Sequence, residues 1–199
     1  MKFFPSDKEN LILSLITNDS LLAEKVGMLC NVDLYPNLEQ PESLSNDQLR
    51  YSISGKVFAH DGGGGDYALL EDGSIGYNGQ EYECGRIAEN FMELLEIGLN
   101  CAYSWFNYSQ KGLMNNPDLL QQETMKCELI GNKQFVDAYG NEIGELNELK
   151  KELASLLNLH ISDDISKDIL PRFFTTATRE PLYFWEHKES LARSDDLVR

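Results

Sequence analysis

The sequence predicts an α+β fold in which an antiparallel β-meander packs against helices, with additional helices at the C-terminus. Three observations support this class. An amphipathic helical pattern occupies residues 7–29, short strand-like segments follow one another between residues 51 and 77, and helical patterns resume at Arg86. Because the strands are consecutive and do not alternate with helices, this order favours α+β over a doubly wound parallel sheet.

The N-terminal segment predicts one helix over 7–29, followed by a loop over 31–47 that contains Pro36 and Pro41. Its apolar residues recur at helical spacings, and they are Leu11, Leu15, Leu22, Val26 and Leu29. Such spacings place the residues on one helix face. The polar cluster Thr17–Ser20 marks a point where this helix could divide into two.

The centre of the chain predicts three strands joined by glycine turns. The strands are Tyr51–Ala59, Tyr67–Leu70 and Ile75–Tyr77. Four consecutive glycines at 62–65 are expected to form a turn, because glycine has no side chain to pack in a strand. Asp72-Gly73 lies between two apolar runs, which is a strong hairpin signal, and Asn78-Gly79 is a second turn candidate.

The rest of the chain predicts further helices. Their expected limits are Arg86–Leu99, a helix from Pro117 capped by Asn116, Glu142–Leu159, and Asp163–Thr176 capped by Ser162. Pro171 is expected to kink or interrupt the last of these, because proline lacks the backbone donor. The charged tail after Trp185 is expected to fray. We assign 1–112 to an α+β core and 113–199 to a C-terminal helical extension packed on the same domain.

The charge balance excludes some classes of partner. The 199 residues contain 17 Lys and Arg against 33 Asp and Glu, a net charge of −16. Phosphate contacts need clustered basic residues, so we expect neither nucleic-acid binding nor docking on an anionic membrane. The sequence contains no run of about 20 apolar residues and no secretory signal, which predicts a cytoplasmic protein. Cys30, Cys84, Cys101 and Cys127 form no CxxC pair and are expected to be reduced, buried thiols.

No catalytic constellation is apparent in the sequence. The three histidines are spread along the chain, and the glycine run lacks the Lys-Ser/Thr and following helix of a phosphate-binding loop. We therefore expect no enzyme activity, no cofactor and no metal. His60, next to Asp61 and the glycine run, is the one histidine in a suggestive place. It leaves open an alternative, a small-ligand or enzymatic site near His60 and the glycine-rich turn.

Two neighbouring stretches carry a family resemblance. Residues 55–77 read GKVFAHDGGGGDYALLEDGSIGY, and residues 85–95 read GRIAENFMELL. The succession of apolar strand, glycine-rich turn, Y-x-L-L strand, acidic glycine turn and A-x-x-F-x-E-L-L helix resembles the SMI1/KNR4-like (SUKH) superfamily. The resemblance covers roughly residues 50–108. It implies an α+β scaffold for binding proteins, in many bacterial members an immunity protein that neutralises a toxin, and it brings no catalytic residues.

The leading hypothesis is a non-enzymatic protein-binding protein, an immunity protein whose partner is a basic toxin domain such as a nuclease. An acidic surface would steer such a partner towards itself. The candidate contact residues lie on or beside the meander turns and are Asp61, Asp66, Glu71, Asp72, Tyr77, Glu81, Tyr82 and Glu83. A second alternative is a regulatory scaffold that binds through an exposed apolar stripe on the Ile143–Leu157 helix. The oligomeric state is not predicted.

Overall fold

A computed structural model describes residues 2–38, 44, 48–80, 82–101, 105–109, 112–131, 134–136, 142–190 and 192–198. The α-helices are α1 (Asp7–Asn18), α2 (Ser20–Cys30), α3 (Phe91–Asn100), α4 (Pro117–Gly131), α5 (Leu146–Leu157) and α6 (Ile169–Ala177), and Trp105–Tyr108 forms a 3₁₀ turn. The strands are β1 (Asp33–Leu34), β2 (Leu49–Tyr51), β3 (Gly55–His60), β4 (Asp66–Leu70), β5 (Ile75–Asn78), β6 (Glu83–Ala88), β7 (Gln134–Val136), β8 (Glu142–Glu145), β9 (Trp185–His187) and β10 (Asp195–Asp196). The fold is α+β, as the sequence predicts.

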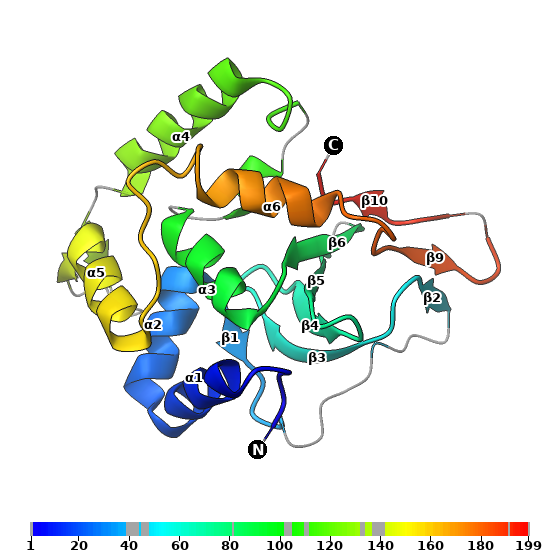
Figure 1. The fold of residues 1–199 in the computed structure, drawn as a ribbon, viewed down its shortest axis with the longest axis horizontal. Helices are drawn as coiled ribbons and strands as arrows, with labels where there is room; N and C mark the ends of the chain where they lie inside the picture. The colour runs from blue at the N-terminus through cyan, green and yellow to red at the C-terminus, as the bar shows by residue number, and fades with distance from the viewer. Residues whose placement is uncertain are drawn as a thin grey trace.

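The central sheet has the strand order β1-β3-β4-β5-β6-β10. The four middle strands form an antiparallel meander, with β6 added to the three strands that the sequence predicts. β1 pairs antiparallel with β3, and β10 pairs parallel with β6. Helices α1, α2, α3 and α6 lie together to one side, while the small β2–β9 sheet lies at the far end of the meander from α5 (Figure 1).

Two hydrophobic cores hold these layers together. The larger core joins the helices to one face of the sheet and includes Phe58, Ile87 and Phe91, each with 0% of its surface exposed. The smaller core forms on the other face, where residues of β4 and β6 meet the chain around β2 and β9. Its buried members are Ile53, Ala68, Leu70, Cys84, Tyr183 and Trp185.

The N-terminal helical segment divides in two, at the place that the polar cluster marks. Ser6 and Glu9 form a capping box at the start of α1. Asp19 is extended and ends α1, and its carboxylate accepts hydrogen bonds from Leu21 N and Leu22 N at 3.0 and 3.1 Å. Capping groups of this kind satisfy the first amides of a helix, so α2 starts directly after α1 ends.

The predicted helix over 86–99 begins too early. Residues 83–88 form β6, and α3 starts at Phe91 with Asn90 as its cap, whose side chain accepts from Glu93 N at 3.0 Å. Glu9 of α1 also accepts from Phe91 N at 2.8 Å. The beginning of α3 is therefore held by a residue 82 positions away, a contact that local periodicity does not encode.

Other element boundaries also differ from the sequence predictions. Tyr51 belongs to β2, which pairs with β9, and β3 begins only at Gly55. Residues 142–145 form β8, so the predicted helix starts at Leu146 as α5. α6 starts at Ile169, and Pro171 falls within its first turn, where the missing amide costs nothing.

The tail after Trp185 does not fray. It forms β9 and β10, and Leu197 is only 4% exposed. A Cβ at Gly85 would lie 2.5 Å from the Cβ of Leu197, so the glycine lets the tail approach β6. The C-terminal segment that we assign to a helical extension is thus partly strand, and it completes the central sheet.

One buried cation ties this tail to the meander. Arg86 of β6 is 1% exposed, and its guanidinium donates to Ser74 Oγ at 3.1 Å and Asp72 Oδ2 at 2.7 Å. It also donates to the carbonyl oxygen of Arg179 at 3.0 Å and to that of Pro181. A buried guanidinium is tolerated only when its donors are satisfied in this way.

Three of the four cysteines lie among the described side chains, and all three are buried: Cys30, Cys84 and Cys101. Burial raises the pKa of the Cys30 thiol and of the Cys84 thiol to about 12. Both therefore remain protonated at neutral pH, as expected for structural cysteines.

Replacing Arg86 should destabilise the fold far more than replacing an exposed arginine. We expect Arg86→Leu to lower the free energy of unfolding by about 3 kcal/mol, because Asp72 and two carbonyl oxygens lose their donor. Arg50 pairs with Glu186 at 2.5 Å, but its side chain is 75% exposed. Arg50→Leu should therefore cost less than about 1 kcal/mol. Urea unfolding of both variants measures the difference, and equal losses would contradict the role given to Arg86.

Candidate functional site

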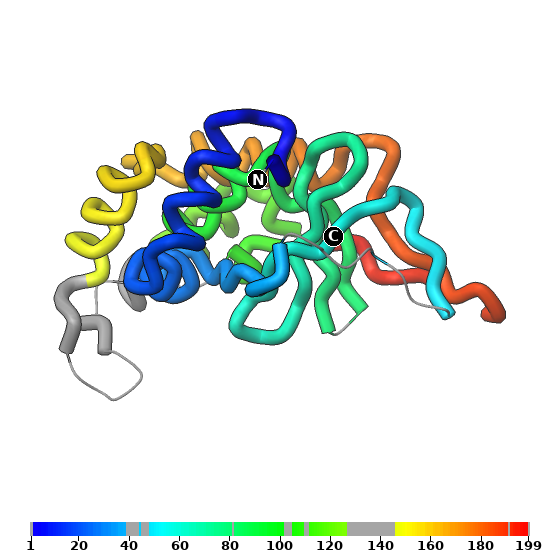
Figure 2. Tube along the Cα trace, turned by 90° about the horizontal axis from the view of Figure 1, so that it is seen from below, coloured from blue at the N-terminus to red at the C-terminus, as the bar shows by residue number. Residues whose placement is uncertain are grey.

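The predicted contact residues lie at two opposite ends of the meander. In the strand register, Asp66 pairs with both His60 and Asn78, so the β3–β4 and β5–β6 turns share one end. Glu71 and Asp72 lie in the β4–β5 turn at the other end. In Figure 2 the first two turns point to the bottom, whereas the β4–β5 turn lies at the top beside the N-terminal segment. We call these ends the glycine-turn end (residues 61–66 and 78–83) and the Asp72 end (residues 71–74).

The carboxylate of Asp61 forms its hydrogen bonds within and beneath the glycine turn. Its Oδ1 accepts from Gly63 N at 2.9 Å and from Gly65 N at 2.7 Å, and its Oδ2 accepts from Tyr77 Oη at 2.8 Å. Asp61 is 8% exposed. Aspartate side chains stabilise turns by bonding amides ahead of them in the chain. Asp61 therefore stabilises the turn from a buried position, whereas the sequence prediction places it among the candidate partner contacts.

Tyr77 is likewise structural. It is 5% exposed and packs against Tyr67 and Trp105, with ring centroids 5.4 and 4.8 Å away. Burial, together with its hydrogen bond to Asp61, raises the pKa of the Tyr77 hydroxyl well above its usual value. A Cβ at Gly65 would collide with that hydroxyl. The glycine run thus allows the turn to close over Tyr77.

Tyr82 is the most exposed of the predicted aromatic contacts. It is 66% exposed, and its backbone has a φ of 73°, a left-handed conformation that a tyrosine rarely adopts. Its carbonyl oxygen accepts from Asp195 N at 2.9 Å, and its ring lies 5.8 Å from that of Trp185. The tail therefore supports the turn that presents Tyr82. Glu81 lies outside the described residues.

Among the described residues, three partly exposed carboxylates at or beside the glycine-turn end form no ion pair. Asp33 and Asp66 flank His60 in the register, and Glu83 begins β6 next to Tyr82. Asp66 accepts a hydrogen bond from Tyr35 Oη at 2.8 Å. Within the described part of the chain, no lysine or arginine forms an ion pair with any of the three. Asp195 adds a further acid beside this end.

The Asp72 end is neutralised. Asp72 pairs with Arg86 at 2.7 Å and Arg179 at 3.2 Å, and Arg179 also pairs with Glu89 at 2.5 Å. Partial burial acts to raise the pKa of Asp72, but hydrogen bonds from Ser74 and Arg86 outweigh it and hold that pKa below its usual value. Both acids of this turn are exposed, but Asp72 is engaged in ion pairs, whereas Glu71 forms none with any described residue.

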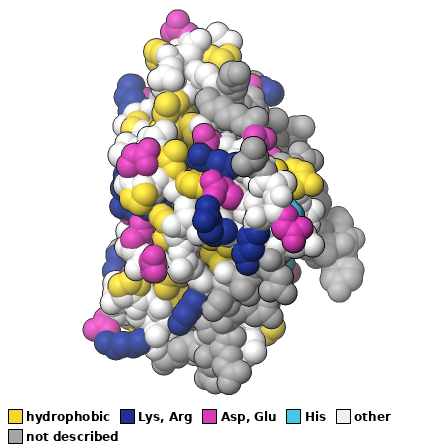
Figure 3. Space-filling model, turned by 90° about the vertical axis from the view of Figure 1, so that its right-hand side faces the viewer, with side chains coloured by type: hydrophobic (Ala, Val, Ile, Leu, Met, Phe, Trp, Pro, Cys, Tyr) yellow, Lys and Arg dark blue, Asp and Glu magenta, His cyan; other side chains and the backbone are white. Residues whose placement is uncertain are grey.

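The charge excess does not cover the whole surface evenly. On the side that carries β2, β9 and β10, acidic and basic side chains are interspersed (Figure 3). Arg50 pairs with Glu186 there, and Arg193 pairs with Asp196. This side of the molecule therefore differs from the glycine-turn end in the ion pairs that its acidic side chains form, and not only in its residue composition.

His60 does not face Asp61 in the manner of a catalytic pair. Its Nδ1 lies 3.0 Å from the backbone oxygen of Asp61, and its ring packs 5.1 Å from Tyr35, while the Asp61 carboxylate is used within the turn. Among the residues that the structure describes, no group of three or more His, Cys, Asp or Glu side chains could hold a metal ion. No helix in the same part of the chain is long and apolar enough to cross a membrane.

Comparison of the chain with protein-family models, with curated proteins and with solved structures finds no significant match. The case for the site therefore rests on geometry. Sequence reasoning missed Asp33 and Asp195, because their place beside the glycine turn depends on the pairing of β1 and β10. It also missed Arg86, although an arginine within an apolar stretch was a visible signal of a buried ion pair.

The glycine turn should tolerate substitution at one position and not at another. We expect Gly65→Ala to lower the free energy of unfolding by about 2 kcal/mol, because its methyl group displaces the Tyr77 hydroxyl from Asp61. At Gly63 a Cβ would meet nothing closer than the Asp61 carboxylate at 3.4 Å. Gly63→Ala should therefore change the free energy of unfolding by less than about 0.5 kcal/mol. Thermal unfolding of the two variants compares them, and equal effects would contradict this packing.

The Asp72 ion pair should give a stability that depends on pH. Because the folded-state pKa of Asp72 is lowered, its contribution is present above the unfolded pKa of about 3.9 and is lost as the pH falls below that value. We therefore expect Asp72→Asn to destabilise the protein at pH 6 and to have a shrinking effect below pH of about 4. Urea unfolding across this range tests the trend. Glu71→Gln, at the exposed neighbour, should have little effect throughout, and a pH-independent loss in Asp72→Asn would refute the assignment.

Proposed function

We propose that this chain is a non-enzymatic, cytoplasmic protein-binding protein that neutralises a basic partner, in the manner of an immunity protein acting on a toxin nuclease. The observation that carries the proposal is the glycine-turn end, where an exposed tyrosine stands beside carboxylates that form no ion pair with any described residue. The partner would contribute lysines and arginines that otherwise hold nucleic-acid phosphates. No cofactor, nucleic acid or membrane takes part.

Several features suit this end to binding. Aromatic side chains that project from a fixed backbone are the usual anchors of protein interfaces. Tyr82 projects in this way and is supported by Trp185 and by the tail. Asp66 and Glu83 lie on flanking strands and would complement a basic surface. Because Asp61 fixes the neighbouring glycine turn, little backbone freedom would be lost on binding.

The resemblance to the SMI1/KNR4-like superfamily supports the same proposal. The motif that resembles this family covers the meander and α3. Its glutamate, Glu93, has a structural role in this chain. It accepts from Glu89 N at 2.7 Å at the beginning of α3. The proposal therefore places the interface on the turns, outside the helix motif that holds the scaffold together.

The regulatory-scaffold alternative has less support from the contacts. It requires an exposed apolar stripe on the predicted Ile143–Leu157 helix. Within α5, Leu146, Leu153 and Leu157 are buried, and Leu156 is exposed at 56%. A single exposed leucine does not make an apolar patch of the size that marks an interface.

Affinity capture from the source cells tests the proposal. We expect the wild-type chain to retain a protein with an isoelectric point above about 9, and its affinity to fall as salt is raised. Tyr82→Ala should weaken the purified complex by about 30-fold, the loss typical of an interface anchor. Asp66→Asn with Glu83→Gln should slow association and reduce the salt dependence.

The matched control uses the other end of the meander. Glu71→Gln removes an exposed acid from the β4–β5 turn and should leave the affinity unchanged. The proposal fails if the captured partner is acidic, if its affinity ignores salt, if nothing is captured, or if Glu71→Gln weakens binding as much as the substitutions at the glycine-turn end.

A further inference from the structure

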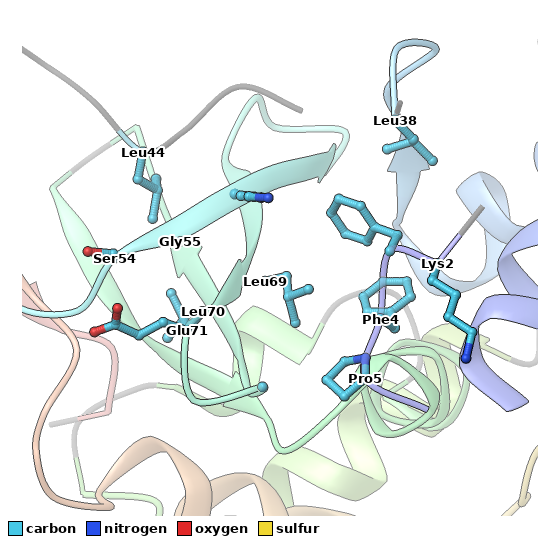
Figure 4. Close-up of a pocket in the computed structure, with 13 residues that line it drawn as sticks. Lys2, Phe4, Pro5, Leu38, Leu44, Ser54, Gly55, Leu69, Leu70 and Glu71 are labelled. Carbon is cyan, nitrogen blue, oxygen red and sulfur yellow. The ribbon is translucent and has the colours of Figure 1, made fainter. Parts of the chain in front are cut away.

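A second feature of the molecule lies apart from the glycine-turn end. A cavity of about 700 Å³ separates the N-terminal segment from β3 and β4. Phe3, Phe4, Leu38, Leu44 and Leu69 give it apolar walls, with Leu38 on the same side as Phe4 and Pro5 and Leu44 across from them (Figure 4). This volume falls within the range of small-molecule sites, about 300–1,000 Å³.

The N-terminal wall of this cavity is held in place. Asn10 is 8% exposed, and its side chain accepts from Phe3 N at 2.5 Å and Phe4 N at 2.9 Å, while donating to Phe4 O at 2.7 Å. The Phe4 ring stacks on Phe91 at 4.6 Å and meets Phe58 at 5.3 Å. Terminal residues usually fray unless they are tied down, so this wall is a built feature of the fold.

Among the described residues, the charged side chains that line the cavity are mostly basic, whereas the chain as a whole is acidic. The described residues that line the cavity include two lysines, Lys2 and Lys56, and one acid, Glu71, in a chain with 33 acids and 17 bases. Lys2 pairs with Asp7 at 2.8 Å, a surface pair in which both side chains are about four-fifths exposed. Lys56 is exposed and forms no ion pair with any described residue. Lys56 thus places an ammonium group that is in no ion pair with the described residues beside an apolar cavity.

We propose that this cavity binds a small amphipathic carboxylate, with its hydrocarbon chain against the phenylalanines and leucines and its head group at Lys56. The size of the cavity favours a thin chain over a helix of a protein partner. A helix about 11 Å across with a 5.4 Å pitch fills roughly 500 Å³ per turn, so the cavity has room for little more than one turn. This inference goes beyond the proposed function and does not depend on it.

Octanoate is the probe for the test, and 1-octanol is the neutral ligand of equal chain length. At 0.15 M salt the Debye length is about 8 Å, which screens the remaining acids of the chain but not a contact at Lys56. Calorimetric titration should give one octanoate per chain, with 1-octanol bound at least five-fold more weakly. Nuclear Overhauser effects should join the octanoate methyl group to protons of Phe4 and Leu69.

Lys56→Gln should weaken octanoate binding at least five-fold and leave 1-octanol binding unchanged. Lys8→Gln is the matched control, because Lys8 is also exposed but does not line the cavity. The proposal is overturned if octanoate shows no saturable binding up to about 5 mM, on the order of the Kd of a weak ligand. It is also overturned if the Overhauser contacts lie elsewhere, or if both lysine variants have the same effect.

Discussion

The buried guanidinium of Arg86 is the interaction on which most of this architecture depends. It joins the meander to the chain at Arg179 and Pro181, and from there the tail continues through Tyr183 and Trp185. Those two residues cover the second face of the sheet. The same tail then adds β10 to the edge of β6 and supports the backbone of Tyr82. A cation within an acidic protein thus organises both the smaller core and the presentation of the exposed tyrosine.

Arg86 and Arg179 also explain why the two ends of the meander differ. They neutralise Asp72 and Glu89 at one end, and the described acids at the glycine-turn end have no such counterpart. Within the described part of this chain of net charge −16, the fold thus pairs some carboxylates and leaves others without an ion pair. The unpaired carboxylates flank the turn that carries Tyr82, and this coincidence favours a basic partner there.

The sequence was informative wherever local chemistry decides the structure. The meander, the turns at 62–65 and 72–73 and the division between α1 and α2 follow from glycine, aspartate and apolar spacing. It failed where distant contacts decide. Residues 83–88 contain a glycine and an arginine and lead into a helical pattern, yet they form β6, because distant carbonyl oxygens satisfy Arg86 and Leu197 packs over Gly85.

At the candidate site too, the exposure of some residues follows from local sequence and that of others from distant contacts. The exposed position of Tyr82 agrees with its prediction from a turn. Asp61 and Tyr77 are buried although they were predicted as contact residues, because their mutual hydrogen bond joins the β3–β4 turn to strand β5, 16 residues further along the chain. The two-residue strand β10 consists only of aspartates and gives no strand signal. Its pairing with β6 could be known only from the folded chain.

The most direct test of the central claim is to map the partner's footprint on the chain by amide chemical shifts. With the captured basic partner added, the account predicts perturbations at residues 62–66 and 78–83, with Tyr82 among the largest, and unperturbed amides at residues 71–74. A footprint centred on residues 71–74 or on α5, with the glycine-turn end unchanged, would contradict it.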